Sequence, residues 1–304
     1  MQRETPFWRT SPFWLLMAIL ALVAALIYLG NRYRDVTVGM EIVPKVMSRK
    51  AAALSAMKMS IVKSVEAEKS AVMANTDEDS IRFAEESRRA FEAAEKSLRE
   101  LAELIATYPS VPEKELLQEF DSCWSEFRKA DQQVLEFAVQ NTNLKAARLS
   151  FGAASTAMNE FGHALSGLLS DSTSGPVCRL VYDAQTAALG IHLLHAPHIA
   201  SPDDQEMDDI EKLIRQNDAV VRKALVDIRR MIVPANRKVA RQAEAAYDAF
   251  MEFTDRVLEW SRQNTNIKSF ELSLNRKRKI TAQCEEILTK LQEAIQSRAF
   301  KATR

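Results

Sequence analysis

The chain contains little glycine and little proline, 7 and 9 residues among 304. Both residue types destabilise helix interiors, proline by about 3 kcal/mol. Alanine, glutamate, lysine, arginine, leucine and glutamine dominate instead, which is typical of long helices. We therefore expect an all-α fold, and the length is compatible with two modest domains.

An excess of charge of either sign is also missing, because 41 basic residues balance 41 acidic ones. Proteins that bind nucleic acid need a basic surface to contact the phosphates. The balance therefore argues against a nucleic-acid partner.

Cysteine is scarce as well, and Cys123, Cys178 and Cys284 lie far apart in the chain. Their number is odd and no Cys-x-x-Cys pair is present, so the sequence indicates neither a zinc site nor a disulfide framework. We expect three small buried residues in helix cores.

One stretch occurs twice: Gln-Asn-Thr-Asn-Leu-Lys at residues 140–145 returns as Gln-Asn-Thr-Asn-Ile-Lys at 263–268. The similarity extends outward, since Phe127 matches Phe250 at the same spacing. A repeat of this kind indicates two copies of one helical module. Helices of similar length with short joints then predict two tandem antiparallel four-helix bundles.

An uncharged stretch between Arg9 and Arg32 precedes the repeats, and residues 13–29 in it are continuously apolar. With its flanks it reaches roughly the 20 residues that cross a bilayer. We expect an uncleaved transmembrane helix in the lipid bilayer. The alternative is a cleaved signal peptide, whose apolar region is shorter and precedes an Ala-x-Ala site that is missing here.

The expected organisation follows from these signals. It is a tail (residues 1–10), a transmembrane anchor (11–31), a joint at Gly39 and Pro44 (32–44), a first bundle (45–170), a linker (171–176) and a second bundle (177–304). The positive-inside rule favours a cytoplasmic soluble part, but long domains cross membranes largely regardless of flanking charge, so the side stays open.

The pattern resembles the four-helix-bundle sensor domain of methyl-accepting chemotaxis proteins. The resemblance lies in the anchor that runs into the first helix, in the stretch Ala67–Glu78, and in an aromatic-rich third helix that ends in Gln-Asn-Thr-Asn. It covers most of residues 35–300 as two tandem units. It implies a periplasmic bundle that binds small ligands, often between helices, and with the one predicted anchor we expect a single-pass protein of the bacterial inner membrane. A second membrane helix and an output module, which such receptors need for signalling, are lacking in this sequence.

Histidines cluster between residues 161 and 200, and His192 and His195 would share one helix face. With Asp203 they are weak candidates for a metal site. Pro197 predicts a helix end near residue 196, so His198 should point elsewhere. The spacing matches neither a zinc finger nor His-Glu-x-x-His, and we expect a polar helix end without a metal or cofactor.

The two Asn-Thr-Asn elements are expected to be turns, since Asn and Thr favour caps. In adjacent up-down bundles these turns, residues 75–78 and residues 195–204 would share one pole. We expect this pole to bind a partner, with Asn141, Asn143, His195, His198, Asn264 and Asn266 as candidate contacts. A basic run at residues 276–279 is expected to be a solvated face.

No nucleophile with its base, phosphate loop or carboxylate pair is apparent, so we expect no enzyme. The first hypothesis is a membrane-anchored helical scaffold or accessory subunit that docks on a larger membrane protein complex of photosynthetic or respiratory type. The alternative is a periplasmic small-ligand sensor module that acts through a separate partner. A pocket with convergent polar groups would favour the sensor, and a dry core with an exposed apolar patch would favour the scaffold.

Overall fold

Helices account for nearly all of the described chain. The computed structural model describes residues 11–169 and 174–302, without the side chains of residues 11–15, 31–43 and 301–302, and no strand occurs in this part. The all-α prediction is confirmed. The predicted tail, residues 1–10, and half of the predicted linker, residues 171–173, lie outside the described residues.

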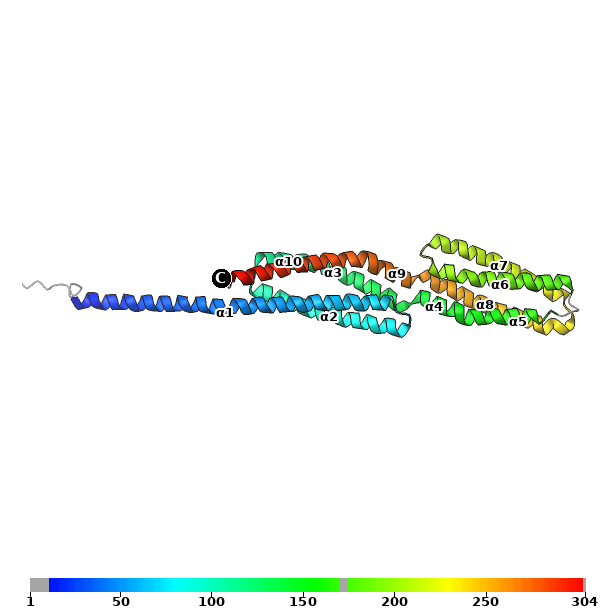
Figure 1. The fold of residues 1–304 in the computed structure, drawn as a ribbon, viewed down its shortest axis with the longest axis horizontal. Coiled ribbons are helices and arrows are strands. Elements are labelled where there is room, and N and C mark those ends of the chain that lie inside the picture. Colours follow the sequence, from blue (N-terminus) through cyan, green and yellow to red (C-terminus); the bar gives the residue numbers. More distant parts are fainter. Residues whose placement is uncertain (1–10, 170–173, 303–304) are drawn as a thin grey trace, which may run out of the picture. The chain divides into compact units, whose positions relative to one another are not determined.

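The helices are labelled in Figure 1. The first repeat contains α1 (Ser11–Val72), α2 (Asp77–Thr107), α3 (Val111–Gln140), α4 (Thr142–Leu149), the π-helix η2 (Ser150–Ala154) and α5 (Ser155–Ser166). The second contains α6 (Gly175–Ala200), α7 (Asp204–Met231), the 3₁₀ turn η3 (Pro234–Asn236), α8 (Arg237–Gln263), α9 (Thr265–Glu271), the π-helix η4 (Leu272–Lys277) and α10 (Arg278–Ala302).

Capping side chains fix the starts of α2 and α7. The Thr76 hydroxyl accepts the Asp79 amide at 3.0 Å, and Asp203 accepts the amides of Gln205 and Glu206. Such caps satisfy amides that have no partner inside the helix.

The expected joint at residues 32–44 is not a break. α1 is one helix of 62 residues and continues through Gly39 and Pro44. A proline removes one donor and costs about 3 kcal/mol, which a helix of this length can absorb.

Within the described residues, no helix is both long enough and apolar enough to cross a membrane. This finding contradicts the predicted anchor over residues 11–31 and the single-pass inner-membrane location that rested on it.

The chain forms two compact units that interleave in sequence. Unit 1 holds the residues up to Val62, Ala90–Trp124 and those from Ala282 onward; unit 2 holds Lys63–Arg89 and Ser125–Thr281. This division differs from the predicted consecutive bundles at 45–170 and 177–304. In particular, most of α10 belongs to a unit with parts of α1, α2 and α3.

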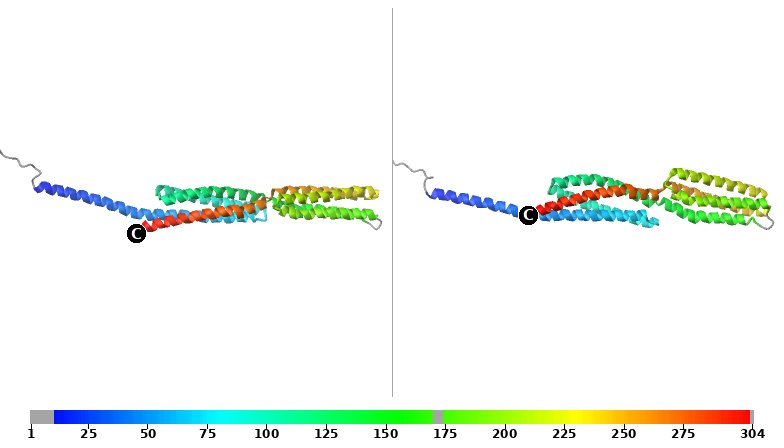
Figure 2. Two further views of the ribbon diagram at one scale, coloured as in Figure 1. Left: turned by 90° about the horizontal axis from the view of Figure 1, so that it is seen from above. Right: turned by 45° about the horizontal axis from the view of Figure 1, so that its top comes forward.

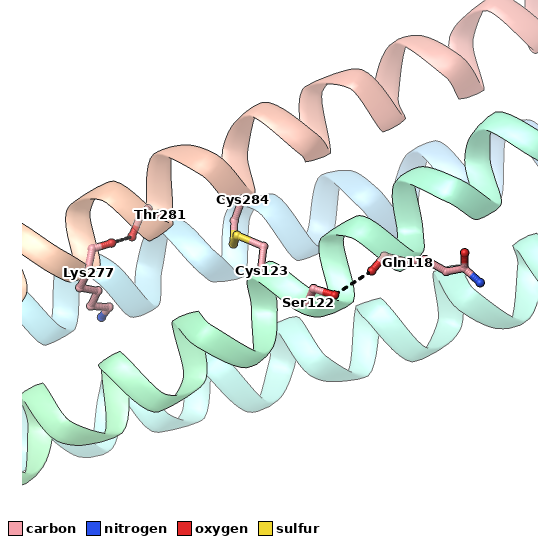
Figure 3. The surroundings of a disulfide bond; sticks show 6 residues. All are labelled: Gln118, Ser122, Cys123, Lys277, Thr281 and Cys284. Carbon is pink, nitrogen blue, oxygen red and sulfur yellow. Dashed lines mark hydrogen bonds between the residues drawn. A yellow bond between two sulfur atoms is a disulfide. The ribbon is translucent and has the colours of Figure 1, made fainter.

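Unit 1 has an apolar core that a disulfide crosses. Leu54, Phe120 and Leu291 are at most 1% exposed, and the Trp124 ring stacks on Phe91 with centroids 4.7 Å apart. Figure 3 shows the bond from Cys123 on α3 to Cys284 on α10, 161 residues later, with Cα atoms 5.8 Å apart. The prediction that the sequence holds no disulfide is therefore wrong.

Part of unit 2 is a set of four helical segments around a common core. α6 packs along α7, and α5 packs along α8; Figures 1 and 2 agree on both pairs. Phe161, Val181, Val221 and Phe250 are almost completely buried between them. Burying such side chains stabilises the unit by roughly 1.5–3 kcal/mol each.

Candidate functional site

The two Asn-Thr-Asn elements begin with the two residues of the described chain that have positive φ without being glycine. Asn141 has φ 51° and ψ 38°, and Asn264 has φ 57° and ψ 33°. Asparagine adopts this left-handed conformation more readily than most residues. Each Asn therefore interrupts the helix for a single residue, and α4 or α9 begins directly after it.

The two elements bind each other as a pseudo-symmetric pair in unit 2. The amide of Thr142 donates to the Thr265 hydroxyl at 3.1 Å, and the Thr265 amide donates to the Thr142 hydroxyl at 3.2 Å. The Asn143 and Asn266 amides donate to each other's side-chain oxygens at 3.1 and 3.2 Å. We call this pair of elements the polar joint.

The Asn side chains also tie the polar joint to the helix hairpins. Asn141 Nδ2 donates to Asp77 at 3.0 Å, and Asn264 Nδ2 donates to the Ser201 carbonyl at 2.8 Å. Arg148 donates to the Asn75 carbonyl at 2.7 Å. The structure thus brings together the segments that the sequence placed at one pole.

The joint leaves little hydrogen-bonding capacity for a partner. Asn141, Asn143 and Asn264 are 1%, 8% and 5% exposed, and their side chains bond within the joint or to its neighbours. Partner binding by these residues and Asn266 stays a prediction, but the arrangement is that of a buried structural junction.

α6 does not end near residue 196 as predicted, because it continues through Pro197 to Ala200. His195 and His198 consequently both lie in the interior, each 0% exposed. The prediction that His198 points away was wrong, since a proline in a last turn removes one hydrogen bond without ending the helix.

His195 is held between two hydroxyl groups. Its Nδ1 lies 3.0 Å from Ser150 Oγ on η2, and its Nε2 lies 3.2 Å from Thr254 Oγ1 on α8. The Thr254 hydroxyl donates to the Phe250 carbonyl, so its oxygen accepts from Nε2–H and leaves Nδ1 to accept from Ser150. Burial, and then the charges of His192 and His198, lower the pKa of His195 to about 4. The ring is therefore neutral at pH 7.

His198 links the core to a surface ion-pair cluster. Its Nδ1 lies 2.8 Å from Ser261 Oγ, and its Nε2 lies 3.2 Å from Glu211, which also accepts from Arg262 at 2.8 Å. Burial lowers the pKa of His198, although Glu211 opposes this effect. His198 is a core side chain with satisfied partners.

Of the metal candidates, the His192 and His195 rings lie edge to face with centroids 5.4 Å apart. His192 bonds to the Ser150 carbonyl at 3.1 Å, while Asp203 caps α7. No cluster of three or more His, Cys, Asp or Glu side chains in the described chain is arranged to hold a metal ion.

A second buried polar cluster contains a lysine from the basic run. Lys277 on η4 is 1% exposed and pairs with Glu68 on α1 at 3.0 Å and with Asp131 on α3. The expected solvated face is thus wrong for this residue. Asp131 lies 11 residues before Thr142, and Thr254 lies 11 residues before Thr265. Both repeats thus have a polar cluster between the third helix and a π-helix. π-Helices are frequent at functional sites.

The described chain also has a groove of about 520 Å³ between α7 and α8. α7 contributes Glu211, Ile214, Arg215, Asp218 and Arg222, and α8 contributes Met251, Asp255, Leu258, Glu259 and Arg262. Steps of three and four residues place each set on one face of its helix. We call this feature the α7–α8 groove.

Sequence reasoning missed the groove, although its charges are spaced at helical intervals. On α7 acidic and basic residues alternate at 211, 215, 218 and 222. This pattern is typical of a solvent-exposed helix face, so it does not by itself distinguish a site from an ordinary surface.

No protein-family model matches the chain, and no curated protein matches it. The resemblance to chemoreceptor sensor domains therefore stays a prediction.

Proposed function

We propose that the chain is a non-enzymatic helical scaffold or accessory subunit that docks on a larger protein complex. The observation that carries this proposal is the apolar segment at residues 16–29 of α1. Its large side chains are 45–65% exposed on all sides of the helix, for example Leu22 at 63% and Leu26 at 59%. A helix that is apolar all round is normally buried in a larger structure.

The polar groups give further support to a structural role. The asparagines that carried the site predictions bond to one another inside unit 2, and His195 and His198 bond to serine, threonine and glutamate side chains there. No group among them is left exposed as a nucleophile or base for chemistry. The expectation that the partner is a membrane complex of photosynthetic or respiratory type stays a prediction from the sequence.

Affinity purification of the tagged full chain from its native host in mild detergent, with cross-linking and quantitative mass spectrometry, tests the proposal. We expect one protein, or one set of subunits, at a fixed ratio to the chain. The variant Leu22→Gln/Leu26→Gln should lose these proteins, because glutamine amides are costly to bury without partners.

Leu193→Gln provides the matched control, because Leu193 on α6 is similarly exposed at 65%. It should retain the partner. Recovery of the chain alone, recovery with lipid but no protein, or equal retention by the Leu22→Gln/Leu26→Gln variant would each contradict docking through this segment.

A further inference from the structure

The middle of the α7–α8 groove carries two carboxylates that form no hydrogen bond or ion pair with a side chain of the described residues. Asp255 and Glu259 are one helical turn apart on α8, both are exposed, and neither has a hydrogen bond or ion pair within residues 11–169 and 174–302. Carboxylates four residues apart lie on one helix face and repel each other. The charge of Arg222 acts on Asp255 from nearby, but the lining holds four carboxylates against three arginines, so the groove carries a net negative charge.

The arginines at the two ends of the groove are already occupied. Arg262 donates to Glu211 at 2.8 Å and also pairs with Asp208, while Arg222 pairs with Asp218 at 2.9 Å and Asp248 at 3.3 Å. Hydrogen bonds to these carboxylates raise the pKa of Arg262. These side chains therefore do not offer a free cation to an anionic ligand.

The third arginine of the groove is also paired. Arg215 lies 3.5 Å from Glu211, one turn earlier on α7. Each groove arginine thus has at least one carboxylate partner. The ligand that would improve the charge balance is a cation.

The floor of the groove is apolar. Ile214 is 3% exposed, and Met251 and Leu258 are partly buried beside it. From residue 211 to residue 222 the lined face of α7 extends about 16 Å, at 1.5 Å per residue. The groove thus combines carboxylates with apolar side chains, and its volume lies within the range of small-molecule sites.

We propose that the α7–α8 groove binds an aliphatic di- or polyamine. Its ammonium groups pair with Asp255 and Glu259, and its methylene chain lies on Ile214 and Leu258. An extended amine fits because its charges alternate with apolar segments, as the carboxylates and apolar side chains of the groove do. A compact metal cation would leave the apolar side chains uncovered.

The titration of Asp255 is consistent with this site. Burial, and then the nearby charge of Asp218, raise the pKa of Asp255, while the charge of Arg222 opposes this effect. A bound ammonium group would relieve this unfavourable environment, because an opposite charge stabilises the ionised carboxyl.

Isothermal titration of the full chain with spermidine and with 1,4-diaminobutane, at about 0.15 M salt where exposed charges are screened, tests the proposal. Asp255→Asn/Glu259→Gln should weaken binding on the order of tenfold for each carboxylate removed, which corresponds to about 1.4 kcal/mol each. Asp209→Asn/Glu252→Gln is the matched control: it makes the same two changes on exposed faces of α7 and α8 outside the groove. The control should bind as the unchanged chain does.

Three results would overturn the proposal. Equal binding by the two double variants would place the amine elsewhere. Displacement of spermidine by an equal concentration of magnesium would show a nonspecific counterion effect, and binding of succinate in place of the amines would show an anion site. The docking function is tested separately, because these variants leave residues 16–29 unchanged.

Discussion

Removal of the Cys123–Cys284 bond should destabilise unit 1 strongly. The bond closes a loop of 161 residues, and the chain-entropy relation gives about 5 kcal/mol for a loop of this length, with about 2–4 kcal/mol typical of measured disulfides. The bond connects α3 to α10, which are far apart in sequence. Without it, α10 is held to unit 1 only by packing and by contacts such as Lys58 with Gln292 at 3.0 Å.

Urea unfolding followed by far-ultraviolet circular dichroism measures this effect on the oxidised chain, the chain treated with dithiothreitol, and Cys123→Ala/Cys284→Ala. We expect both changes to lower the urea midpoint of the transition that reports on unit 1. Cys178→Ala serves as the control, and it should leave the disulfide in place.

Thiol titration of the unfolded, non-reduced chain provides the independent check. It should detect one free thiol, because two of the three cysteines are bonded. Three free thiols, or a urea midpoint that dithiothreitol does not change, would refute the reasoning.

Three further predictions concern buried polar groups in unit 2. Lys277→Met should cost about 3–5 kcal/mol in urea unfolding, because it leaves two buried carboxylates without a counter-charge, while the exposed neighbouring change Arg276→Met should cost less than about 0.5 kcal/mol. Thr265→Val should cost about 1–3 kcal/mol, and its effect should be non-additive with Thr142→Val in a double-mutant cycle. The pKa of His195 is about 4 in the folded chain, below the usual 6.5. The contribution of the neutral ring to the free energy of unfolding is therefore fully present above pH 6.5 and should fall by up to about 3 kcal/mol as the pH drops to 4. His195→Gln should reduce this loss, and an unchanged pH dependence in the variant would contradict a buried neutral ring.

Helix positions were predictable because their signals are local. The cap at Thr76, the Ser-Pro-Asp-Asp start of α7 and the apolar spacing of α3 depend only on neighbouring residues. Pro44 and Pro197 were wrongly expected to interrupt or end a helix. A proline lowers helix stability, but the surrounding packing decides where the helix ends.

Long-range pairing was not predictable from the same signals. A disulfide between residues 161 positions apart has no spacing motif, and the odd cysteine count argued against it. Lys277 looks like any residue of a basic run, and only the fold places Glu68 and Asp131 beside it. The juxtaposition of the joint segments was predictable, but the mutual pairing of the Asn-Thr-Asn elements was not.

The pairing explains why the repeat preserves these particular residues. A single left-handed residue is too short to reverse a helix, since helix hairpins use loops of about 2–5 residues. α4 and α5 accordingly pack with α6 and α8 of the other repeat, while α10 is bonded to α3 of the first. Each repeat therefore contributes its last helix to a unit built with the other repeat.

The polar joint makes this exchange reciprocal. Thr142 and Thr265 each use the other's hydroxyl as the acceptor for a buried amide. A chain with only one repeat would leave such an amide buried without a partner, at a cost of about 1–3 kcal/mol for each group. The two Asn-Thr-Asn elements thus complete each other's hydrogen bonds. A substitution in one element should destabilise the helices of the other repeat as strongly as the helices of its own repeat.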